Sequence, residues 1–581
     1  MTKRWRFSPH DSARVAGLER AAGVPSVVAQ LLILRGVQDA ATARLFLDAK
    51  LTGLREPDLL PGVPAAADRI YEAIQAKRRI IVYGDYDADG MTSSSILFRC
   101  LTLLGGDVGY YVPNRMDEGY GLNDEALKTL HGRGASLVIT VDCGIASVAQ
   151  AETARQLGLD LIITDHHEFG DELPRATAIV HPRLPGYAYP FAGLCGAGVA
   201  LKLAWALCQR ASQAKKVSEP MRNFLLQAVG LAALGTVADV VPLVDENRIL
   251  VRHGLTSLKE RPTLGLAALL KVTELDKKPA LSSEDIGFTL APRINAAGRL
   301  GQAQLGVELL ITENAERAQA LAEYIHQLNT SRDSLERSVM LAATKMIKED
   351  FDAENDPAFV LAGRGWHPGV IGIVAGRLVE KFHRPVVLIA LDQLGVKLGI
   401  GSARSANGLN LHEALAECTD HLASHGGHAA AAGLKVEESK VDAFRAAFCE
   451  HVSGAVSDED RIAEIVLDAE APFSALSLDI VRQIEQLAPF GAGNPRPLLA
   501  ATGVRLAEPP RRIGSGERHL SLKLQQHGVQ IRCVGFGHGE SADEIAQCPG
   551  TLDVAYRPVI NDFRGRQNVE LHLVDWRPTK A

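Results

Sequence analysis

Between Lys77 and Val180 the chain alternates short apolar runs with longer stretches in which apolar residues recur every three or four positions. Each short run, typified by "RRIIVYGD" and "LDLIITDHH", predicts a buried strand, and each longer stretch, such as "MTSSSILFRCLTLLG", predicts a helix. Strands that are almost continuously apolar and alternate with helices are typical of a parallel sheet covered on both faces. We therefore expect a doubly wound α/β fold in this part of the chain.

The pattern changes beyond this region. A helical region at about 196–270 is followed, from Asn314, by a long amphipathic stretch that predicts one long helix or a broken pair connecting two lobes. Strands and helices then alternate again in a smaller α/β unit, and period-2 alternation in "HLSLKL" and "VELHLV" predicts an antiparallel barrel or small sandwich. The expected domains are an N-terminal segment 1–50, an α/β domain 51–300, a connecting long helix 301–354, a smaller α/β domain 355–455 and a β-barrel domain 456–581.

The composition is that of an ordinary globular protein. The 581 residues exceed what one hydrophobic core usually organises, and 46% of them are hydrophobic. Since no apolar run reaches the roughly 20 residues of a membrane span and the first residues lack a signal-peptide core, we expect a cytoplasmic protein without membrane contact. The scattered Cys100, Cys195 and Cys208 are interpreted as buried apolar residues. A net charge of −7 argues against a uniformly basic nucleic-acid binder and allows a local basic surface.

Metal-capable side chains follow the three strongest predicted strands at the point where each strand ends. Strand by strand, they are Asp85, Asp87 and Asp89, then Asp142, then Asp165, His166 and His167. Because the carboxyl ends of parallel strands meet at one edge of a sheet, we expect these side chains to converge. A further carboxylate, Asp239, lies in the apolar run "GTVADVVPL", where burial without a cation would be unfavourable.

Oxygen-rich ligands with one or two imidazoles suit Mn²⁺ or Mg²⁺ better than Zn²⁺. The set is large enough for two ions that share a bridging carboxylate, an arrangement that activates water and stabilises charge at a phosphorus atom. Taken singly, Asp85 or Asp142 is equally well interpreted as the cap of a following helix, and two adjacent histidines as ordinary ones. Their convergence at three successive strand ends favours the metal site.

The second α/β unit offers groups that suit an anionic substrate. "RINAAGRLG" contains Arg299, "GSARSANGLNL" contains Ser402 and Arg404, and "SHGGHAAAAG" contains His428 among glycines. An arginine can hold a phosphate bidentately, and a glycine-rich turn can present backbone N–H groups. Each arginine alone could instead form a surface salt bridge. The interrupted alanine run, a helix-forming composition, indicates tight backbone packing.

Seven stretches occur in the order that the DHH phosphoesterase superfamily shows. They are "GDYDADG", "VDCG", "TDHH", "GTVADVVPL", "RINAAGRLG", "SARS" and "GGHAAAAG". Within that superfamily the chain resembles the RecJ family of bacterial 5′→3′ single-strand-specific DNA exonucleases, and "LAPFGAGNPRP" with the C-terminal β-rich domain extends the resemblance to nearly the whole sequence. The resemblance implies a DHH domain, a DHHA1-like domain and a C-terminal OB-fold.

The resemblance also implies roles for individual residues. The metal ligands would be Asp85, Asp87, Asp89, Asp142, His166 and Asp239, with Mn²⁺ as two ions and Mg²⁺ as a substitute. Asp142 would bridge the ions, and Asp87 and Asp89 are the favoured direct ligands of their cluster. His167 resembles a catalytic or phosphate-contacting partner, whereas Tyr83 stands where some members carry a histidine ligand. The residues expected to bind substrate phosphate are Arg299, Ser402, Arg404 and His428.

The start of the predicted barrel is locally basic. Seven Lys or Arg and two Asp or Glu lie between Arg496 and Arg532. Such a surface can follow the backbone of a single strand, although a solvated barrel face has the same composition. The residues expected to bind DNA are Arg511, Arg512 and Arg518. The aromatic residues Phe490, Phe536 and Tyr556 could stack on bases or belong to the core.

The features of the chain predict metal-dependent hydrolysis at a phosphorus atom. The resemblance implies that the enzyme is a 5′→3′ exonuclease that hydrolyses single-stranded DNA to mononucleotides in DNA recombination and repair. The resemblance implies a bacterial cytoplasmic monomer whose partners are a single-strand binding protein and a RecQ-type helicase. One alternative is a phosphoesterase of short oligonucleotides or cyclic dinucleotides, which would not need the long helix and the barrel. Another is a binding protein of the same fold without catalysis, which the complete set of ligand residues disfavours.

Overall fold

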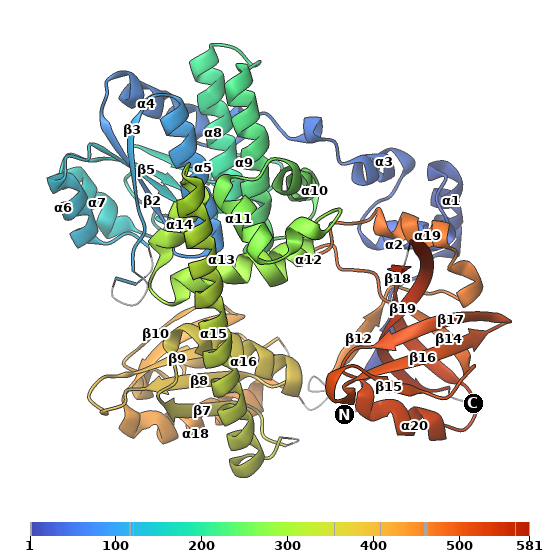
Figure 1. Cartoon of the computed structure of the whole chain (residues 1–581). Helices are drawn as coiled ribbons and strands as arrows, with labels where there is room; N and C mark the ends of the chain where they lie inside the picture. The colour runs from blue at the N-terminus through green and yellow to red at the C-terminus, as the bar shows by residue number, and fades with distance from the viewer. Residues whose placement is uncertain are drawn as a thin grey trace.

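The computed structural model describes residues 3–114, 118–119, 121–353, 355–406, 408–457, 463–563 and 565–579. These residues form three lobes, which Figure 1 shows at the upper left, the lower left and the right. The first lobe covers about residues 51–312 and the second about 355–456, while the third combines both ends of the chain. A single long helix passes from the first lobe to the second.

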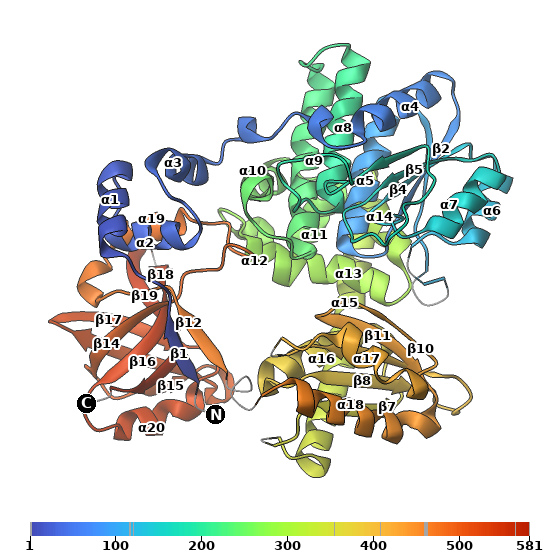
Figure 2. The same ribbon diagram turned by 180° about the vertical axis from the view of Figure 1, so that it is seen from behind.

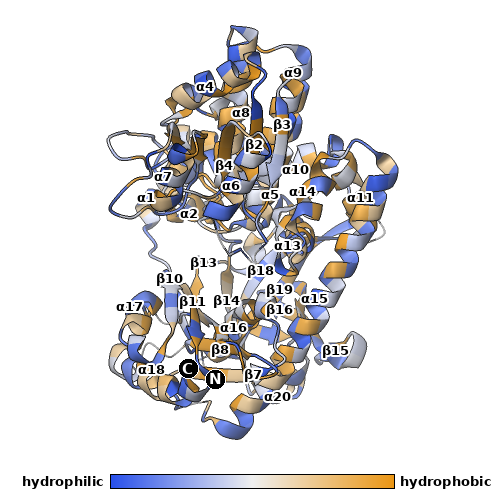
Figure 3. Cartoon of the chain, turned by 90° about the vertical axis from the view of Figure 1, so that its left-hand side faces the viewer, coloured by the Kyte–Doolittle hydropathy of each residue, from blue (hydrophilic) through white to orange (hydrophobic). Residues whose placement is uncertain are grey.

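A parallel five-stranded sheet organises the first lobe. In spatial order its strands are β3 (Asp107–Tyr111), β2 (Arg79–Gly84), β4 (Leu137–Val141), β5 (Asp160–Thr164) and β6 (Ala178–Val180). On β2, Val82 faces a core shared with α4 (Val63–Gln75) and α5 (Ala88–Leu103), and Tyr83 faces a second core under α6 (Asp124–Gly132) and α7 (Val148–Gln156). The predicted doubly wound α/β fold is confirmed. Figure 3 shows the hydrophobic colour of β4 inside this lobe.

Helices complete the first lobe. They are α8 (Gly196–Ser212), α9 (Glu219–Ala238), α10 (Asp245–Glu260), α11 (Leu264–Val272), α12 (Ser283–Asp285), a π-helical turn (Ile286–Leu290), α13 (Ala291–Arg299) and α14 (Ala303–Ile311). By length and composition alone, α9 could cross a membrane. It packs against α5, α8 and α10, which makes it a central helix of this lobe. Cys100, Cys195 and Cys208 are buried as expected.

Helix α15 (Ala315–Asp350) is one continuous helix of 36 residues, which decides between the two possibilities left by the sequence. Its first turn is capped by Asn314, whose side chain accepts a hydrogen bond from the Arg317 backbone N–H at 2.9 Å. The helix packs on α11, α13 and α14 near its start, and on the second lobe further along. It therefore ties the two lobes together along its length.

The second lobe is a smaller α/β unit. Its sheet runs in the order β10 (Ser424–Gly427), β11 (Ala431–Val436), β9 (Gly399–Arg404), β8 (Val386–Leu391) and β7 (Phe359–Arg364), with α16 (Pro368–Phe382), α17 (Leu411–Ala416) and α18 (Val441–Ala455) around it. The alanine run of "GGHAAAAG" lies in the β10–β11 hairpin and forms no helix. A side chain at Gly427, which has φ of +134°, would lie 2.6 Å from the Ala431 carbonyl oxygen, so the hairpin is packed as tightly as the glycines indicated.

The C-terminal domain is a barrel. Its strands are β13 (Ala469–Glu470), β14 (Leu499–Leu506), β15 (Arg511–Ile513), β16 (His519–Gln526), β17 (Val529–Gly535), β18 (Leu552–Phe563) and β19 (Arg566–Pro578). The pairing β14-β18-β19-β17-β16 closes through β14–β16, which gives the five-stranded barrel of an OB-fold. The expected antiparallel pairing holds for most strand pairs, whereas β17 and β19, and also β13 and β14, run parallel. Alternation along a strand reports which face is buried, and it says nothing about a neighbour's direction.

The N-terminal segment belongs to the barrel lobe. Strand β1 (Arg4–Phe7) pairs in parallel with β12 (Glu464–Leu467), and α1 (Ser12–Ala22), α2 (Ser26–Leu34) and α3 (Ala40–Asp48) share a core with the barrel and with α19 (Leu478–Glu485). Figure 2 shows both ends of the chain in this lobe. The Arg248 guanidinium of α10 donates to the carbonyl oxygens of Phe46, Gln486 and Leu487 at 2.9, 3.2 and 2.7 Å. One buried side chain thus connects the first lobe to both ends of the third.

Candidate metal centre

Three carboxylates lie where β2 passes into α5. Asp85 follows the last residue of β2 and is buried. Asp87 is the N-cap of α5 and accepts a hydrogen bond from the Gly90 N–H at 3.0 Å, the role that the sequence analysis considered for Asp85. Asp89 lies in the first turn, fully buried, where both of its oxygens accept backbone N–H groups at the start of α8. These bonds come from Gly196 at 2.6 Å and Ala197 at 2.9 Å.

Asp142 is brought into the same space by an unusual backbone conformation. It follows β4 with φ of +62°, a left-handed conformation that aspartate tolerates better than most residues. Its side chain is buried against α8, since a Cβ at Gly196 would lie only 2.6 Å from the Asp142 Cβ. Glycine is therefore the residue that fits at position 196.

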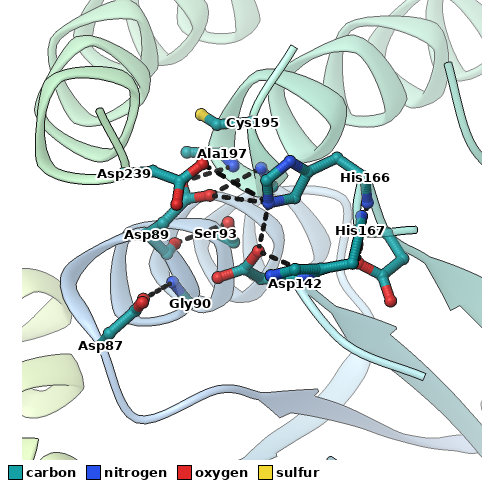
Figure 4. A network of polar contacts seen from close by, with 12 residues as sticks. Asp87, Asp89, Gly90, Ser93, Asp142, His166, His167, Cys195, Ala197 and Asp239 are labelled. Carbon is teal, nitrogen blue, oxygen red and sulfur yellow. Dashed lines mark hydrogen bonds and ion pairs between the residues drawn. The ribbon is translucent and has the colours of Figure 1, made fainter. Parts of the chain in front are cut away.

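The His166 imidazole lies at the centre of the cluster. Its Nε2 is 3.0 Å from Asp142 Oδ1, 3.6 Å from Asp239 Oδ2 and 3.8 Å from Asp89 Oδ2. This nitrogen is buried and makes no hydrogen bond within the described residues. Figure 4 shows it pointing between the carboxylates of Asp89, Asp142 and Asp239. A ring nitrogen aimed at three carboxylates fits the coordination of a cation.

Three overlapping groups have ligand atoms within 4.8 Å of one another. They are Asp89, His166 and Asp239; Asp85, Asp87 and Asp142; and Asp142, His166 and His167. The structure therefore brings together all of the predicted metal-ligand residues and His167. Oxygen and imidazole donors in such number fit Mn²⁺ or Mg²⁺.

The electrostatics of the cluster disfavour the charged carboxylates in the absence of a cation. Burial, together with the neighbouring carboxylates, raises the pKa of Asp142 well above its usual range and that of Asp239 to about 8. Burial also raises the pKa of Asp89, against the opposing effect of His166, and lowers the pKa of His166 to about 4. A divalent cation would reverse this balance for the carboxylates by favouring their ionised forms, and it would bind the His166 imidazole in the neutral form that burial already favours.

His167 is oriented by Asp165, a role that the sequence reasoning missed when it grouped Asp165 with the metal-capable side chains. The Asp165 carboxylate accepts the backbone N–H groups of Ile145 and His166 at 2.9 and 2.7 Å, and its Oδ1 lies 2.7 Å from His167 Nδ1. Although burial lowers the pKa of His167, its bond with Asp165 raises it to about 9. His167 is therefore an imidazolium at neutral pH in the metal-free protein.

A cavity of about 310 Å³ opens beside the cluster. Its lining residues are Asp85, Tyr86, Asp87, His167, Ala238, Asn295 and Arg299. Asn295 was not predicted; its side-chain oxygen accepts the Ala88 N–H at 2.7 Å and holds the start of α5 beside the cavity. Its position between the two arginines of "RINAAGRLG" was the only signal available. Tyr83 does not take part, because its hydroxyl donates to the Gly121 carbonyl on the other face of the sheet.

The predicted phosphate-binding residues fall into three places. Arg299 lines the cavity, and its Nη1 donates to the Gly369 carbonyl of α16 at 3.2 Å, which brings the second lobe against the first. Arg404 and Ser402 lie together on β9 with Nη1 and Oγ 3.0 Å apart, close to α16. His428 is exposed in the turn between β10 and β11, and Ala431, which follows that turn, pairs with Arg404 of β9.

The barrel arginines lie on and after β15. Arg511 is 3.5 Å from Glu508, Arg512 is 2.7 Å from Asp543, and Arg518 donates to the Ser515 carbonyl at 3.2 Å. Phe490 and Tyr556 belong to the core, whereas Phe536 is 59% exposed. Of the three aromatic residues considered for base stacking, Phe536 is therefore the one exposed on the surface.

Known protein families and individual relatives match this chain over nearly its whole length. The DHH family N-terminal domain matches residues 79–236, the DHHA1 domain 355–454 and the RecJ OB domain 467–575. The single-stranded-DNA-specific exonuclease RecJ of Bacillus subtilis (strain 168) is 39% identical over 98% of this chain and 70% of its own length. Its counterpart in Escherichia coli (strain K12) is 36% identical over 95% of each chain.

Solved structures extend the comparison to the fold. RecJ from Thermus thermophilus in complex with Mn²⁺ matches with a TM-score of 0.84 and 34% identity, over 100% of this chain and 80% of that one. The same protein in complex with Mg²⁺ matches with a TM-score of 0.78 and 32% identity, over 100% and 79%. The metals in those structures are the ions that the donor set described above suits.

Proposed function

The chain belongs to the RecJ family of single-stranded-DNA-specific exonucleases, and from that premise we propose how its residues carry out the reaction. It is a divalent-metal-dependent phosphodiester hydrolase that acts on single-stranded DNA. The observation that carries the assignment is the buried His166 Nε2 among three carboxylates, at the edge of a sheet in a chain that also contains an OB barrel. The alternatives of a small-substrate phosphoesterase and a non-catalytic binder lack such support.

Two ions, Mn²⁺ or Mg²⁺, would be held at the cluster. One would be bound by Asp89, His166 and Asp239, and the other by Asp85 and Asp87. Asp142 would be shared, an assignment supported by its place both in the group with Asp85 and Asp87 and in the group with His166. When bound, such ions lower the pKa of water and stabilise charge on a phosphate.

The remaining side chains bind and orient the substrate. Arg299, in the cavity wall, would hold a phosphate, and Ser402 with Arg404 would bind a further phosphate from the second lobe together with His428. His167, kept protonated by Asp165, would donate a hydrogen bond or a proton to the leaving oxygen. Asp165 itself orients the ring through Nδ1 and leaves Nε2 for the substrate.

The direction of degradation and the partners are part of the proposal. A strand held by Arg511, Arg512 and Arg518 on the barrel would enter the site with its 5′ end first and be released as mononucleotides. The family resemblance supports a bacterial cytoplasmic monomer that acts in recombination and repair with a single-strand binding protein and a RecQ-type helicase. The exposed Phe536 supports a contact between the barrel and unpaired bases.

The test is the degradation of a long single-stranded oligonucleotide labelled at either end, with Mn²⁺, Mg²⁺ or chelator, beside duplex and dinucleotide controls. We expect metal-dependent release of mononucleotides from the 5′ end of the single strand. Release from the 3′ end would contradict the proposed polarity. Cleavage confined to dinucleotides would contradict the exonuclease function and favour the small-substrate phosphoesterase.

A further inference from the structure

An apolar pocket of about 260 Å³ adjoins the catalytic cavity. Ala238 and Asn295 line both of them, so the two hollows are neighbours. Asp239, a candidate metal ligand, directly follows Ala238 in the chain. Apart from Ser283, Glu284 and Asn295, the residues that line the pocket carry apolar side chains or none. An apolar surface therefore lies beside the place where the metal centre would bind a phosphate.

An exposed phenylalanine stands in the wall of this pocket. Phe288 lies in the π-helical turn before α13, and its side chain is 81% exposed. Ile286 and Leu290 of the same turn are fully buried in the core of the first lobe, so Phe288 between them faces outward. Ser282 and Asp285 form a capping box that fixes the start of this stretch. The exposure of the ring therefore results from a well-held turn, of a kind that is frequent at functional sites.

A second exposed apolar side chain, that of Val240, lines the same pocket. It is 69% exposed, and its backbone has φ of +60°, a left-handed conformation that is strained for a β-branched residue. Such strain is concentrated at sites that bind ligands. Single exposed apolar side chains are ordinary on a protein surface, whereas two in the wall of one pocket indicate that an apolar group binds there.

The opposite wall of the pocket belongs to the barrel lobe. Phe490, Gly491 and Ala492 line it. Ser283 Oγ donates to the Phe490 carbonyl at 2.6 Å, and the Leu243 N–H donates to the Ala492 carbonyl at 2.7 Å, so the two walls are joined by hydrogen bonds. Figures 1 and 2 show α12 on the side of the first lobe that faces the barrel lobe. A DNA strand bound both to the barrel and at the metal centre would pass this pocket.

We propose that this pocket, here named the base pocket, binds one base of the single-stranded DNA, which stacks on the Phe288 ring while a neighbouring phosphate lies at the metal centre. In a nucleotide the base and the phosphate are attached to one sugar, so an apolar pocket beside a phosphate site matches both parts. Every base has a face that can stack, so the pocket accepts any sequence. A base in a duplex is already stacked between its neighbours and does not fit. The inference deepens the proposed function and rests on it in placing a DNA phosphate at the metal centre.

The stacking surface itself belongs to the first lobe. Phe288 and Val240 both come from residues 51–312, and the barrel lobe adds only the opposite wall. Neither side chain offers a donor atom to a metal ion. Removing the Phe288 ring should therefore weaken the contact with DNA and leave the metal centre unchanged.

The experiment combines a change in the protein with a change in the DNA. Wild type, Phe288→Ala, Phe288→Tyr and Tyr187→Ala are compared as full-length proteins with Mn²⁺. Tyr187 is the matched control, because its ring is 66% exposed in the same lobe and lines neither the cavity nor the base pocket. One substrate is an intact single strand, and the other carries a stable abasic analogue in place of the terminal nucleotides at both ends. The initial rate of strand shortening gives kcat/KM for each pair, whichever end is degraded first.

On the intact strand we expect Phe288→Ala to lower kcat/KM about tenfold, mainly through a higher KM, because it removes one stacking contact. Phe288→Tyr keeps an aromatic ring and should stay within about twofold of wild type, as should Tyr187→Ala. Loss of the terminal bases should slow wild type by about tenfold or more, and should slow Phe288→Ala about tenfold less than it slows wild type. The Mn²⁺ affinity measured by calorimetry should be the same in all four proteins. Since the Phe288 ring is 81% exposed, its loss removes little packing and the alanine variant should fold.

An equal penalty for base loss in wild type and in Phe288→Ala overturns the base pocket, because the ring then contacts no base. A Phe288→Tyr protein as slow as Phe288→Ala overturns stacking as the mode of contact. A wild-type protein that shortens neither strand contradicts the proposed function. In that case the affinities of the Mn²⁺-loaded proteins for the two strands replace the rates in the same comparison, and they still decide on the base pocket.

Discussion

The charged aspartate side chains of the metal centre repel one another unless a cation lies among them. Burial and mutual repulsion hold Asp142 and Asp239 toward their protonated forms, and His166 toward neutrality. A protein that keeps such a cluster gives up stability in its metal-free state in exchange for affinity for a divalent ion. Two consequences can be measured on single residues.

The first is a pH dependence of metal binding. With a pKa of about 8, the Asp239 carboxyl holds a proton below pH 8 that a metal ion has to displace, and none above it. The affinity for Mn²⁺ should therefore rise with pH up to about pH 8, by about tenfold per pH unit for each displaced proton. Calorimetry in buffers of different ionisation enthalpy measures the protons released. A flat affinity from pH 6 to pH 8 would contradict the raised pKa.

The second concerns Asp142. We expect Asp142→Ala to lower the rate of single-strand hydrolysis by about 10³-fold or more, because it removes the carboxylate shared by the two ligand groups. DNA binding in chelator should stay within about twofold of wild type. The matched control is Asp107→Ala, which removes an exposed carboxylate at the opposite edge of the same sheet. If Asp142→Ala digests DNA as fast as this control, the metal-site hypothesis is wrong.

At the scale of elements, two helix N-termini point at the cluster. Helix α5 starts at Ala88 with Asp87 as its N-cap, and α8 directs the backbone N–H groups of Gly196 and Ala197 at Asp89. The partial positive charge of a helix N-terminus favours carboxylates in its first turn, so the two helices offset part of the repulsion among the aspartates. The close approach of α8 to Asp142 requires glycine at position 196.

This requirement predicts that alanine lowers stability and activity at one glycine of α8 and leaves activity nearly unchanged at another. In Gly196→Ala the new Cβ would lie 2.6 Å from the Asp142 Cβ, so we expect a loss of about 2 kcal/mol of stability and at least about tenfold in activity. In Gly198→Ala the new Cβ meets only the flexible Leu194 side chain at 3.2 Å, and activity should stay near wild type. Urea unfolding and the exonuclease rate measure both. Equal behaviour of the two variants would show that position 196 is not packed as described.

At the scale of the whole molecule, both other lobes contact the first lobe close to the candidate metal centre. Arg299 joins the cavity wall to α16 of the second lobe, and the hydrogen bond from the Leu243 N–H to the Ala492 carbonyl joins the segment after Asp239 to the barrel lobe. The barrel arginines lie in a different lobe from the metal cluster, so DNA binding and hydrolysis should be separable by mutation.

The salt dependence of DNA binding tests that separation. Replacing Arg511, Arg512 and Arg518 by alanine should reduce the slope of log affinity against log salt by about 0.7 for each lost phosphate contact, to a total of about 2. Replacing Lys345 and Lys348 on α15 is the control and should leave the slope unchanged. Fluorescence anisotropy in chelator measures the affinity at several salt concentrations. A wild-type slope in the triple variant would contradict the proposed role of these three arginines in DNA binding.

By itself the sequence determined the parallel sheet and the carboxylates at its edge, because strand periodicity and the position after each strand are local properties of the chain. It also determined the family, through the order of short motifs. Only the tertiary structure decided which segments that are distant in the sequence come into contact. Asp165 orienting His167, Asn295 holding α5, the parallel β17–β19 pair and the contact of Leu243 with Ala492 are of this kind. Residues close in space and remote in sequence leave no periodic signal, so packing alone reveals them.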